Sequence, residues 1–488
     1  MLSLSNMKKT LRRATAIWLT LFITINMVLL VFAEPTGEDL LNENRSLHIE
    51  SNDIYGWPKG PVVGAGSACL MDANSGTILY AKNMDTPMYP ASTTKVMTCL
   101  LAVENCQLDE IVTFSNEAVY GIERDSSNVG IDVGQEMTME ECLYCILLAS
   151  ANEVASAVAE HVGGSIEGFA DMMNKRAAEL GCTNTHFMNA NGLHNDDHYT
   201  SAHDLALITA EFFKNETLRN IASTSYYTIY PSAKQPDEFG LTNHHKMLSG
   251  RSHAYEYIVG GKTGYTTVAH QTLASCAEKD GMLLVCTVMR DERPYQYEDT
   301  AALFDYGFEN FKNVNIADNE SNYSLDTSTF FDTDIDIFGS SKDLFTIDRS
   351  DVITIPNDVN FDELTSKLTY DESGDNNILA TITYYLGETS VGSGSILVNN
   401  SEVKEFEFGK KPVKERVTLD EEIEKSGKSI VFVDIKKVLL IIGIVIGGCL
   451  LIFILQAIAR NYSFASRRRR KIIKKHKRYR SEFDDFDF

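Results

Sequence analysis

The stretch that decides the fold is MYPASTTKVMTCLL, residues 88–101. Its second half has apolar residues at the spacing of a helix face, so the sequence predicts a helix over residues 92–105. Ser92 stands at the start of that helix, where serine is a favoured N-cap. Lys95 follows three residues later and lies on the same face as Ser92. Capping alone does not explain a lysine on a face that is about to be buried.

A neutral lysine amine within reach of a serine hydroxyl can act as the general base of that serine. Burial and a neighbouring cation both lower the pKa of a lysine, and together they keep such an amine neutral near neutral pH. The pair Ser92 and Lys95 therefore has the residue types of a nucleophile and its base. The spacing S-x-x-K is nevertheless a weak signal alone, because many helices begin with it.

Two later segments strengthen this signal. Residues 147–161, LLASANEVASAVAEH, place Ser150 and Asn152 two residues apart between apolar helical segments. Residues 257–266, YIVGGKTGYT, place Lys262 on a strand after two glycines, where a substrate backbone can lie close. A cation there would bind a carboxylate and help to keep the first lysine neutral. The motifs S-x-x-K, S-D-N (with alanine in the middle here) and K-T-G, in this order, are the set of β-lactamases and penicillin-binding proteins.

The segments PASTTK, LLASAN and GGKTGYT resemble the D-alanyl-D-alanine carboxypeptidases, the low-molecular-weight penicillin-binding proteins. FMNANGLHNDDHYTSAHDLA (187–206) and FDYGFENF (304–311) resemble further stretches of that family, so the resemblance covers about residues 60–435. The fold that it implies is an α/β (α+β) catalytic domain of the penicillin-binding and β-lactamase-like class. Such a domain combines an antiparallel sheet with helices, and the sheet joins distant parts of the chain.

The resemblance also implies a role for each motif. Ser92 would be the nucleophile and Lys95 its base, while Ser150 and Asn152 would belong to the proton relay and the substrate contacts. Backbone N–H groups of Ser92 and Tyr265 would form the oxyanion hole. The implied substrate-binding residues are Lys262, Thr263, Gly264 and Tyr265, of which Lys262 and Thr263 would hold the terminal carboxylate.

The implied activity is that of a serine-type D-Ala-D-Ala carboxypeptidase. It would remove the terminal D-alanine from peptidoglycan pentapeptide stems through an acyl-enzyme on Ser92, and it would bind β-lactam antibiotics. No metal or organic cofactor is expected. One alternative is a serine β-lactamase-like hydrolase, which would need fast deacylation. The other is a non-catalytic penicillin-binding-like surface module, and the intact set of Ser92, Lys95 and Lys262 argues against it.

The two ends of the chain have the composition of targeting and anchoring segments. Residues 1–33 carry four basic residues, no acidic residue and a long apolar run, which predicts a cleaved signal peptide, with an uncleaved anchor as the alternative. Residues 438–459 are 22 residues without a charge, and residues 467–480 are strongly basic. Basic residues beside a spanning segment mark the cytoplasmic side. The sequence therefore predicts a single-pass protein of the cell membrane, with its catalytic domain on the extracytoplasmic, cell-wall side.

The residue pattern between these ends changes twice. A polar stretch is followed by mixed helix and strand patterns, and these are followed by short alternating strands. Besides the helix over 92–105, helices are predicted over 137–162 and 166–180, from Ser201 onward and near 295–312. The expected order is signal peptide 1–33, linker 34–60, catalytic domain 61–312, small all-β sandwich domain 325–409, charged stalk 410–437, transmembrane helix 438–459 and basic cytoplasmic tail 460–488.

The net charge of the chain is −24 at pH 7. Because much of the basic charge lies in the leader and the tail, the segment between them is more acidic still. Such a surface repels polyanions, so nucleic acid is excluded as a partner. The expected partners are the peptidoglycan stem peptide ending in D-Ala-D-Ala, β-lactams, and the membrane through the C-terminal helix.

Two other groups of residues have ligand chemistry. His194, His198 and His203 could bind zinc, but they lie in a stretch rich in Asn and Gly and lack helical ligand spacing, so no metal site is predicted. Cys142 and Cys145 match C-x-x-C on a helical pattern without a second pair. The spacing of the cysteines is not that of a stapled scaffold, and buried free thiols are expected.

The sequence departs from the family pattern at two places near the motifs. Ala269-His270 stands where the family commonly has an Ala-Gly pair after K-T-G, and Glu153 follows Asn152. The first departure lies beside the strand that is expected to carry the oxyanion hole.

Overall fold

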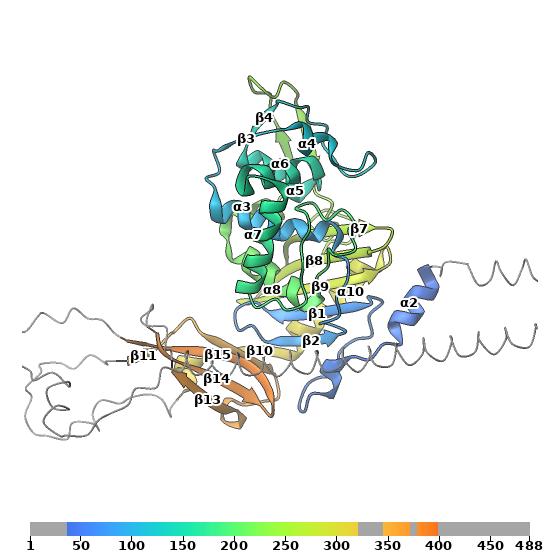
Figure 1. Ribbon diagram of the computed structural model, residues 1–488. Helices are drawn as coiled ribbons and strands as arrows, with labels where there is room; N and C mark the ends of the chain where they lie inside the picture. The colour runs from blue at the N-terminus through green and yellow to red at the C-terminus, as the bar shows by residue number, and fades with distance from the viewer. Residues whose placement is uncertain (1–36, 321–344, 371–377, 399–488) are drawn as a thin grey trace, which may run out of the picture. The chain divides into compact units, whose positions relative to one another are not determined.

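The computed structural model describes residues 37–320, 345–370 and 378–398 (Figure 1). Its centre is an antiparallel sheet of five strands in the order β2-β1-β9-β8-β7. This order places the first two strands of the domain beside its last three, as the sequence predicts. The bounds are β1 Ser67–Asp72, β2 Ile78–Lys82, β7 Ile258–Thr266, β8 His270–Lys279 and β9 Met282–Asp291.

The central strands are buried on both faces. In β1, Cys69 and Met71 point into one apolar core, while Ala68 and Leu70 point into a second. Strand β9 alternates in the same way, so both strands read as nearly continuous apolar runs, which is typical of a sheet covered on two sides. The turn between β1 and β2 falls at residues 73–77, and the two strands form an antiparallel hairpin.

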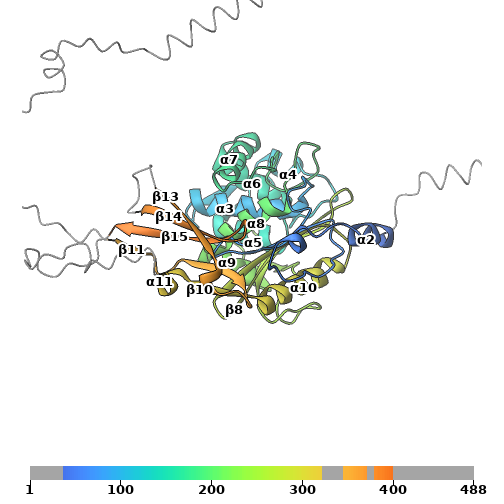
Figure 2. The same ribbon diagram turned by 90° about the horizontal axis from the view of Figure 1, so that it is seen from below.

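Helices cover the two faces of the sheet (Figures 1 and 2). Helix α8 contributes to the first core together with α3, α5, α6 and α7, whereas α10 contributes to the second. The bounds are α2 Gly37–Arg45, α3 Lys95–Asn105, α4 Asn116–Tyr120, α5 Met139–Leu148, α6 Asn152–Gly163, α7 Ile166–Glu179, α8 Ala202–Lys214, α9 Glu216–Ser223, α10 Tyr295–Asn310 and α11 Ile316–Asn319, with 3-10 turns η1 Glu50–Asp53, η2 Ala91–Thr94 and η3 Phe361–Glu363. Two short antiparallel pairs, β3 Ile111–Thr113 with β4 Glu136–Thr138 and β5 Tyr226–Ile229 with β6 Phe239–Thr242, complete the helical part.

The helix predicted over 137–162 is wrong in one respect, because it is two helices. Thr138 forms a capping box with Glu141, so α5 begins at Met139. The chain then breaks at residues 149–151, where Ser150 has a φ of 61°, and α6 begins at Asn152. Apolar residues continue on both sides of the break, so helical periodicity alone does not reveal it.

The linker predicted over residues 34–60 is also wrong for residues 37–60, the part that the structure describes. Helix α2 buries Leu40 and Leu41, and the side chain of Asn44 donates hydrogen bonds to the carbonyl oxygens of Gly64 and Arg290. Trp57 is buried and donates from Nε1 to the Leu79 carbonyl oxygen at 2.8 Å. A few apolar anchors therefore fix an otherwise polar segment against the catalytic domain.

The all-β region predicted over 325–409 is described from residue 345 to 398, apart from residues 371–377. Its strands form a four-stranded sheet in the order β11-β15-β14-β13, and β12 pairs with β10. The bounds are β10 Phe311–Asn315, β11 Phe345–Ile347, β12 Val352–Pro356, β13 Thr365–Tyr370, β14 Ile378–Leu386 and β15 Thr389–Val398.

The predicted signal peptide, stalk, transmembrane helix and basic tail all lie outside the described residues. Among the helices that are described, none has both the length and the apolar composition that crossing a membrane requires.

Candidate active site

The turn η2 and the start of α3 position Ser92 and Lys95. The interpretation of Ser92 as the N-cap of this helix is wrong: Pro90 is the N-cap of η2, and Ser92 lies inside that 3-10 turn, one turn before α3 begins. Ala91 has a φ of 51°, a left-handed value that costs free energy in a residue other than glycine. In the turn that begins at Ala91, the Ser92 side chain is partly exposed, while Lys95 is completely buried.

The amine of Lys95 lies among three oxygen atoms. Lys95 Nζ is 3.1 Å from Ser92 Oγ, 2.6 Å from Asn152 Oδ1 and 2.5 Å from the carbonyl oxygen of Asn191. The last two oxygens only accept hydrogen bonds, so they take two N–H groups of the amine. A neutral amine then has its lone pair left for the Ser92 hydroxyl proton. This arrangement is the one that a general base requires.

The electrostatic surroundings favour the neutral form of Lys95. Burial lowers its pKa well below the ordinary value, and the positive charge of Lys262 lowers it further. Lys262 is itself buried, and desolvation lowers the pKa of its amine to about 7. Lys262 Nζ donates to the Thr263 carbonyl oxygen at 2.8 Å. The two lysines predicted from separate motifs are therefore electrostatically coupled.

The break between α5 and α6 brings the second motif to the site. Asn152 opens α6 and accepts the hydrogen bond from Lys95 already described. Ser150 is also buried, but its hydroxyl has no hydrogen-bond partner within the described residues, so its place in a proton relay stays a prediction. Glu153, a departure from the family pattern, accepts from the backbone N–H groups of Val129 and Gly130. It thereby fixes the loop before β4 against the start of α6.

Strand β7, the edge strand of the sheet, forms the opposite wall. A Cβ atom built on Gly264 would lie 2.9 Å from the Ser92 nitrogen and 3.0 Å from the Pro90 carbonyl oxygen, so only glycine allows this approach. Thr272 on β8 donates to the same Pro90 oxygen at 2.8 Å. The next residue, Tyr265, is 58% exposed. The K-T-G strand therefore runs directly beside the Ser92 backbone.

The departure at Ala269-His270 has a structural explanation. His270 has a φ of 57°, a conformation that glycine adopts without strain, which accounts for glycine as the common residue of the family there. In this chain the imidazole Nδ1 lies 2.7 Å from Glu292 Oε1, and this contact offsets part of the strain. The β7–β8 pairing closes normally at Thr266 and His270, so the substitution leaves the strand in register.

A support behind the nucleophile was not predicted from the sequence. His198 Nδ1 accepts from the Met188 N–H at 3.0 Å, so its Nε2 carries the proton and donates to Thr94 Oγ1 at 2.8 Å. Thr94 in turn donates to the Ala91 carbonyl oxygen. Gly192 lies against the same carbonyl: a Cβ atom built on Gly192 would be 1.9 Å from the Ala91 oxygen, so a larger residue does not fit there. The loop 187–200 thus holds the strained turn that carries Ser92.

Replacing His198 by leucine is expected to destabilise the fold in a pH-dependent way. Burial lowers the pKa of His198 to about 3, from an unfolded value near 6.5, so native stability is lost as the pH falls below 6.5. At pH 8 the substitution should cost about 1–3 kcal/mol, because it leaves two polar groups unpaired. At pH 5 the cost should shrink by about 2 kcal/mol, since the wild type has itself lost that much. Urea unfolding at both pH values measures this.

His48→Gln is the control for that experiment, because His48 is 65% exposed. An equal destabilisation by His198→Leu at both pH values would contradict the buried, neutral state of this imidazole.

The three histidines that could bind zinc do not converge. Both ring nitrogens of His198 are used in the contacts above, whereas His203 lies against Asp85 and His194 against Asp196. The cysteines of the described residues are free, and burial raises the pKa of Cys142 and Cys145 well above the ordinary value. The expectation of buried free thiols is confirmed for the described cysteines except Cys106 and Cys182, which are free but only partly buried, and the C-x-x-C pair is part of the core.

A serine beside a buried lysine with a lowered pKa, with a second lysine on an adjacent glycine-lined strand, is the arrangement of serine hydrolases of the acyl-transfer class. The family model for D-alanyl-D-alanine carboxypeptidase matches residues 57–293. The carboxypeptidase DacF of Bacillus subtilis is 33% identical over 255 residues, which are 51% of this chain and 63% of that protein. A D-alanyl-D-alanine carboxypeptidase of a Streptomyces strain is 30% identical over 258 residues, 51% of this chain and 88% of the other.

The chain belongs to the D-alanyl-D-alanine carboxypeptidase family. Its matched part spans a little under two thirds of the length of the Bacillus relative. Among solved structures, a Streptomyces DD-transpeptidase is similar with a TM-score of 0.49 and 29% identity, over 52% of this chain and 100% of that one.

Proposed function

We propose that this chain is a serine-type D-Ala-D-Ala carboxypeptidase that removes the terminal D-alanine from peptidoglycan stem peptides. The observation that carries the proposal is the contact of 3.1 Å between Ser92 Oγ and the buried amine of Lys95. The family relationship supports the substrate class. Two buried amines with lowered pKa values support the division into a base and a carboxylate-binding cation.

In the proposed reaction, Ser92 Oγ attacks the carbonyl carbon of the penultimate D-alanine while Lys95 accepts the hydroxyl proton. The peptide bond breaks, and the terminal D-alanine leaves with that proton on its amine. Water then attacks the acyl-Ser92 ester with Lys95 again as the base and releases the shortened peptide. Lys262 binds the terminal carboxylate, and the N–H groups of Ser92 and Tyr265 receive the oxyanion.

Penicillin-type antibiotics would acylate the same serine and leave slowly. The oxygens around the Lys95 amine come from Ser92, Asn152 and Asn191, and none of them is a carboxylate that could activate a hydrolytic water. This favours a carboxypeptidase over the alternative of a β-lactamase, which needs fast release of the acyl group. Rapid turnover of penicillin would support the β-lactamase instead.

We also propose that the catalytic domain acts on the outer side of the cytoplasmic membrane. The support is the uncharged segment 438–459, followed by the basic residues 467–480. Peptidoglycan, the proposed substrate, lies on that side. A fluorescent penicillin that does not cross membranes should therefore label the chain in intact cells, and labelling only after lysis would contradict this placement.

The test of the function is D-alanine release from a muramyl pentapeptide by the full chain. The wild type should release one D-alanine per peptide, and Ser92→Ala should release none while keeping its fold by circular dichroism. If the wild type released no D-alanine and took no penicillin label, the chain would be a non-catalytic module.

A further inference from the structure

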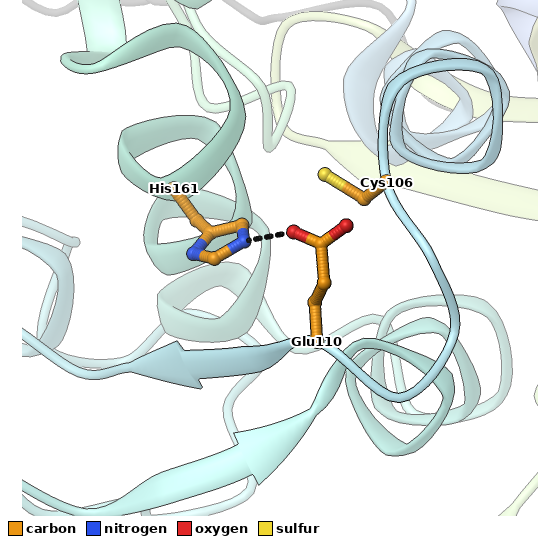
Figure 3. A group of neighbouring side chains, drawn as sticks. All are labelled: Cys106, Glu110 and His161. Carbon is orange, nitrogen blue, oxygen red and sulfur yellow. Dashed lines mark hydrogen bonds and ion pairs between the residues drawn. The ribbon is translucent and has the colours of Figure 1, made fainter.

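Three side chains outside the active site converge at the far ends of the two catalytic helices (Figure 3). Cys106 is the C-cap of α3, Glu110 precedes β3, and His161 lies in the last turn of α6. Figure 3 shows the His161 ring facing the Glu110 carboxylate and the Cys106 sulfur lying beside them. His161 Nε2 is 3.1 Å from Glu110 Oε2, and one ligand atom from each side chain lies within 4.8 Å of the others.

Thiolate, imidazole and carboxylate are the ligands that zinc prefers in proteins. With ordinary zinc–ligand lengths and tetrahedral angles, neighbouring ligand atoms are about 3.4–3.6 Å apart. The distance of 3.1 Å from Nε2 to Oε2 is already close to this value, and the three ligand atoms lie within 4.8 Å of one another, so binding an ion needs only small side-chain movements. We propose that Cys106, Glu110 and His161 form a binding site for a zinc ion, with water completing the coordination.

The backbone prepares the carboxylate of Glu110 for this role. Glu110 Oε1 accepts from the Gln107 N–H at 2.6 Å, which leaves Oε2 directed at His161. The main chain is anchored as well, because the Glu110 carbonyl oxygen accepts from the Met139 N–H at 2.8 Å. Cys106 N–H donates to the Ala102 carbonyl oxygen at the end of α3. The carboxylate of Glu110 and the backbone of Cys106 are therefore held in place before a metal binds.

The charges of the site also suit a divalent cation. Zinc binding would replace the S–H proton of Cys106 by a sulfur–zinc bond and release that proton to solvent. The thiolate and the carboxylate then balance the two charges of the ion, and the neutral imidazole adds none. This neutral complex is compatible with partial burial.

The position of the site gives it a structural role in the proposed enzyme. Helices α3 and α6 carry Lys95 and Asn152 in their first turns and Cys106 and His161 at their other ends. An ion there would join the two helices, together with the start of β3, about 16 Å from Lys95 along α3. Cys106 and Glu110 are close in the sequence, but His161 lies 51 residues after Glu110, so no spacing motif indicated the three together and no metal was predicted.

The experiment titrates the metal-free full chain with Co²⁺, a spectroscopic substitute for zinc, and then with Zn²⁺. A cobalt–thiolate charge-transfer band should appear in the near ultraviolet with one ion per chain, and Zn²⁺ should remove it. Saturating Zn²⁺ should also raise the melting temperature by on the order of 5 °C.

Cys106→Ser should abolish the charge-transfer band, and His161→Gln should weaken cobalt binding at least tenfold. The control is Cys182→Ser, since Cys182 is another partly exposed thiol that is not in the cluster; it should bind like the wild type. No band in the wild type, or a band that survives Cys106→Ser, would overturn the proposal. Neither result bears on D-alanine release, which the metal-free chain should retain.

Discussion

Lys95→Arg is expected to lower the rate of Ser92 acylation by on the order of 10⁴-fold. Lys95 is fully buried, with a pKa well below its ordinary value, so it can accept the serine proton. Arginine is similar in length but does not lose its proton in proteins. The substitution therefore replaces an amine that can accept a proton by a permanent cation that cannot. Stopped-flow acylation by a chromogenic β-lactam measures the effect.

Lys175→Arg is the matched control, because Lys175 is 81% exposed on α7. It should acylate at the wild-type rate. A second variant, Lys95→Met, separates loss of the base from overcrowding by the larger arginine, and it should be equally slow. Near-normal acylation by either Lys95 variant would mean that another group accepts the proton.

Lys262→Gln should lower kcat/KM for a pentapeptide by about 10²–10³-fold, because a buried charge-assisted bond to the terminal carboxylate is lost. A substrate ending in an amide tests this cause directly. The kcat/KM of the wild type for the amide substrate should be as low as that of Lys262→Gln for the ordinary pentapeptide. Lys262→Gln should have the same kcat/KM for both substrates. Discrimination that survives in Lys262→Gln would assign carboxylate recognition to another residue.

The same variant should change the pH profile of kcat/KM on both sides. In the wild type, kcat/KM rises with pH as Lys95 loses its proton. It falls at higher pH as Lys262, whose pKa is about 7 in the free enzyme, loses its proton. Lys262→Gln should lack the falling limb. Its rising limb should move to higher pH, because the positive charge that lowered the pKa of Lys95 is gone. Lys175→Gln should leave both limbs unchanged.

The chemistry-bearing residues of the site could be predicted because each stands in a short local pattern. Ser92 and Lys95 share one turn, and Lys262 follows a double glycine on a strand. Their meeting in space follows from the strand order, which places β7 at the edge of the sheet beside η2. Motif order suggests this meeting, but only the register of the sheet positions Gly264 against Ser92.

The parts that could not be predicted depend on backbone strain and long-range contacts. The break at Ser150 and the left-handed conformation of Ala91 interrupt continuous patterns, and both are held by tertiary contacts rather than by local propensity. His198 was considered as a zinc ligand because His194 and His203 lie near it in the sequence. Its partners, Thr94 and Met188, are known only once the loop has folded onto the turn. The same holds for Cys106 and His161.

The most direct test of the central claim is the location of the covalent adduct after the full chain is treated with penicillin. Intact mass and peptide mapping should find one penicilloyl group on the peptide that contains Ser92. Ser92→Ala should show no adduct, and Lys95→Arg should show one only after greatly prolonged exposure. An adduct on any other residue, or D-alanine release that persists in Ser92→Ala, would contradict the assignment of Ser92 as a nucleophile activated by the amine of Lys95.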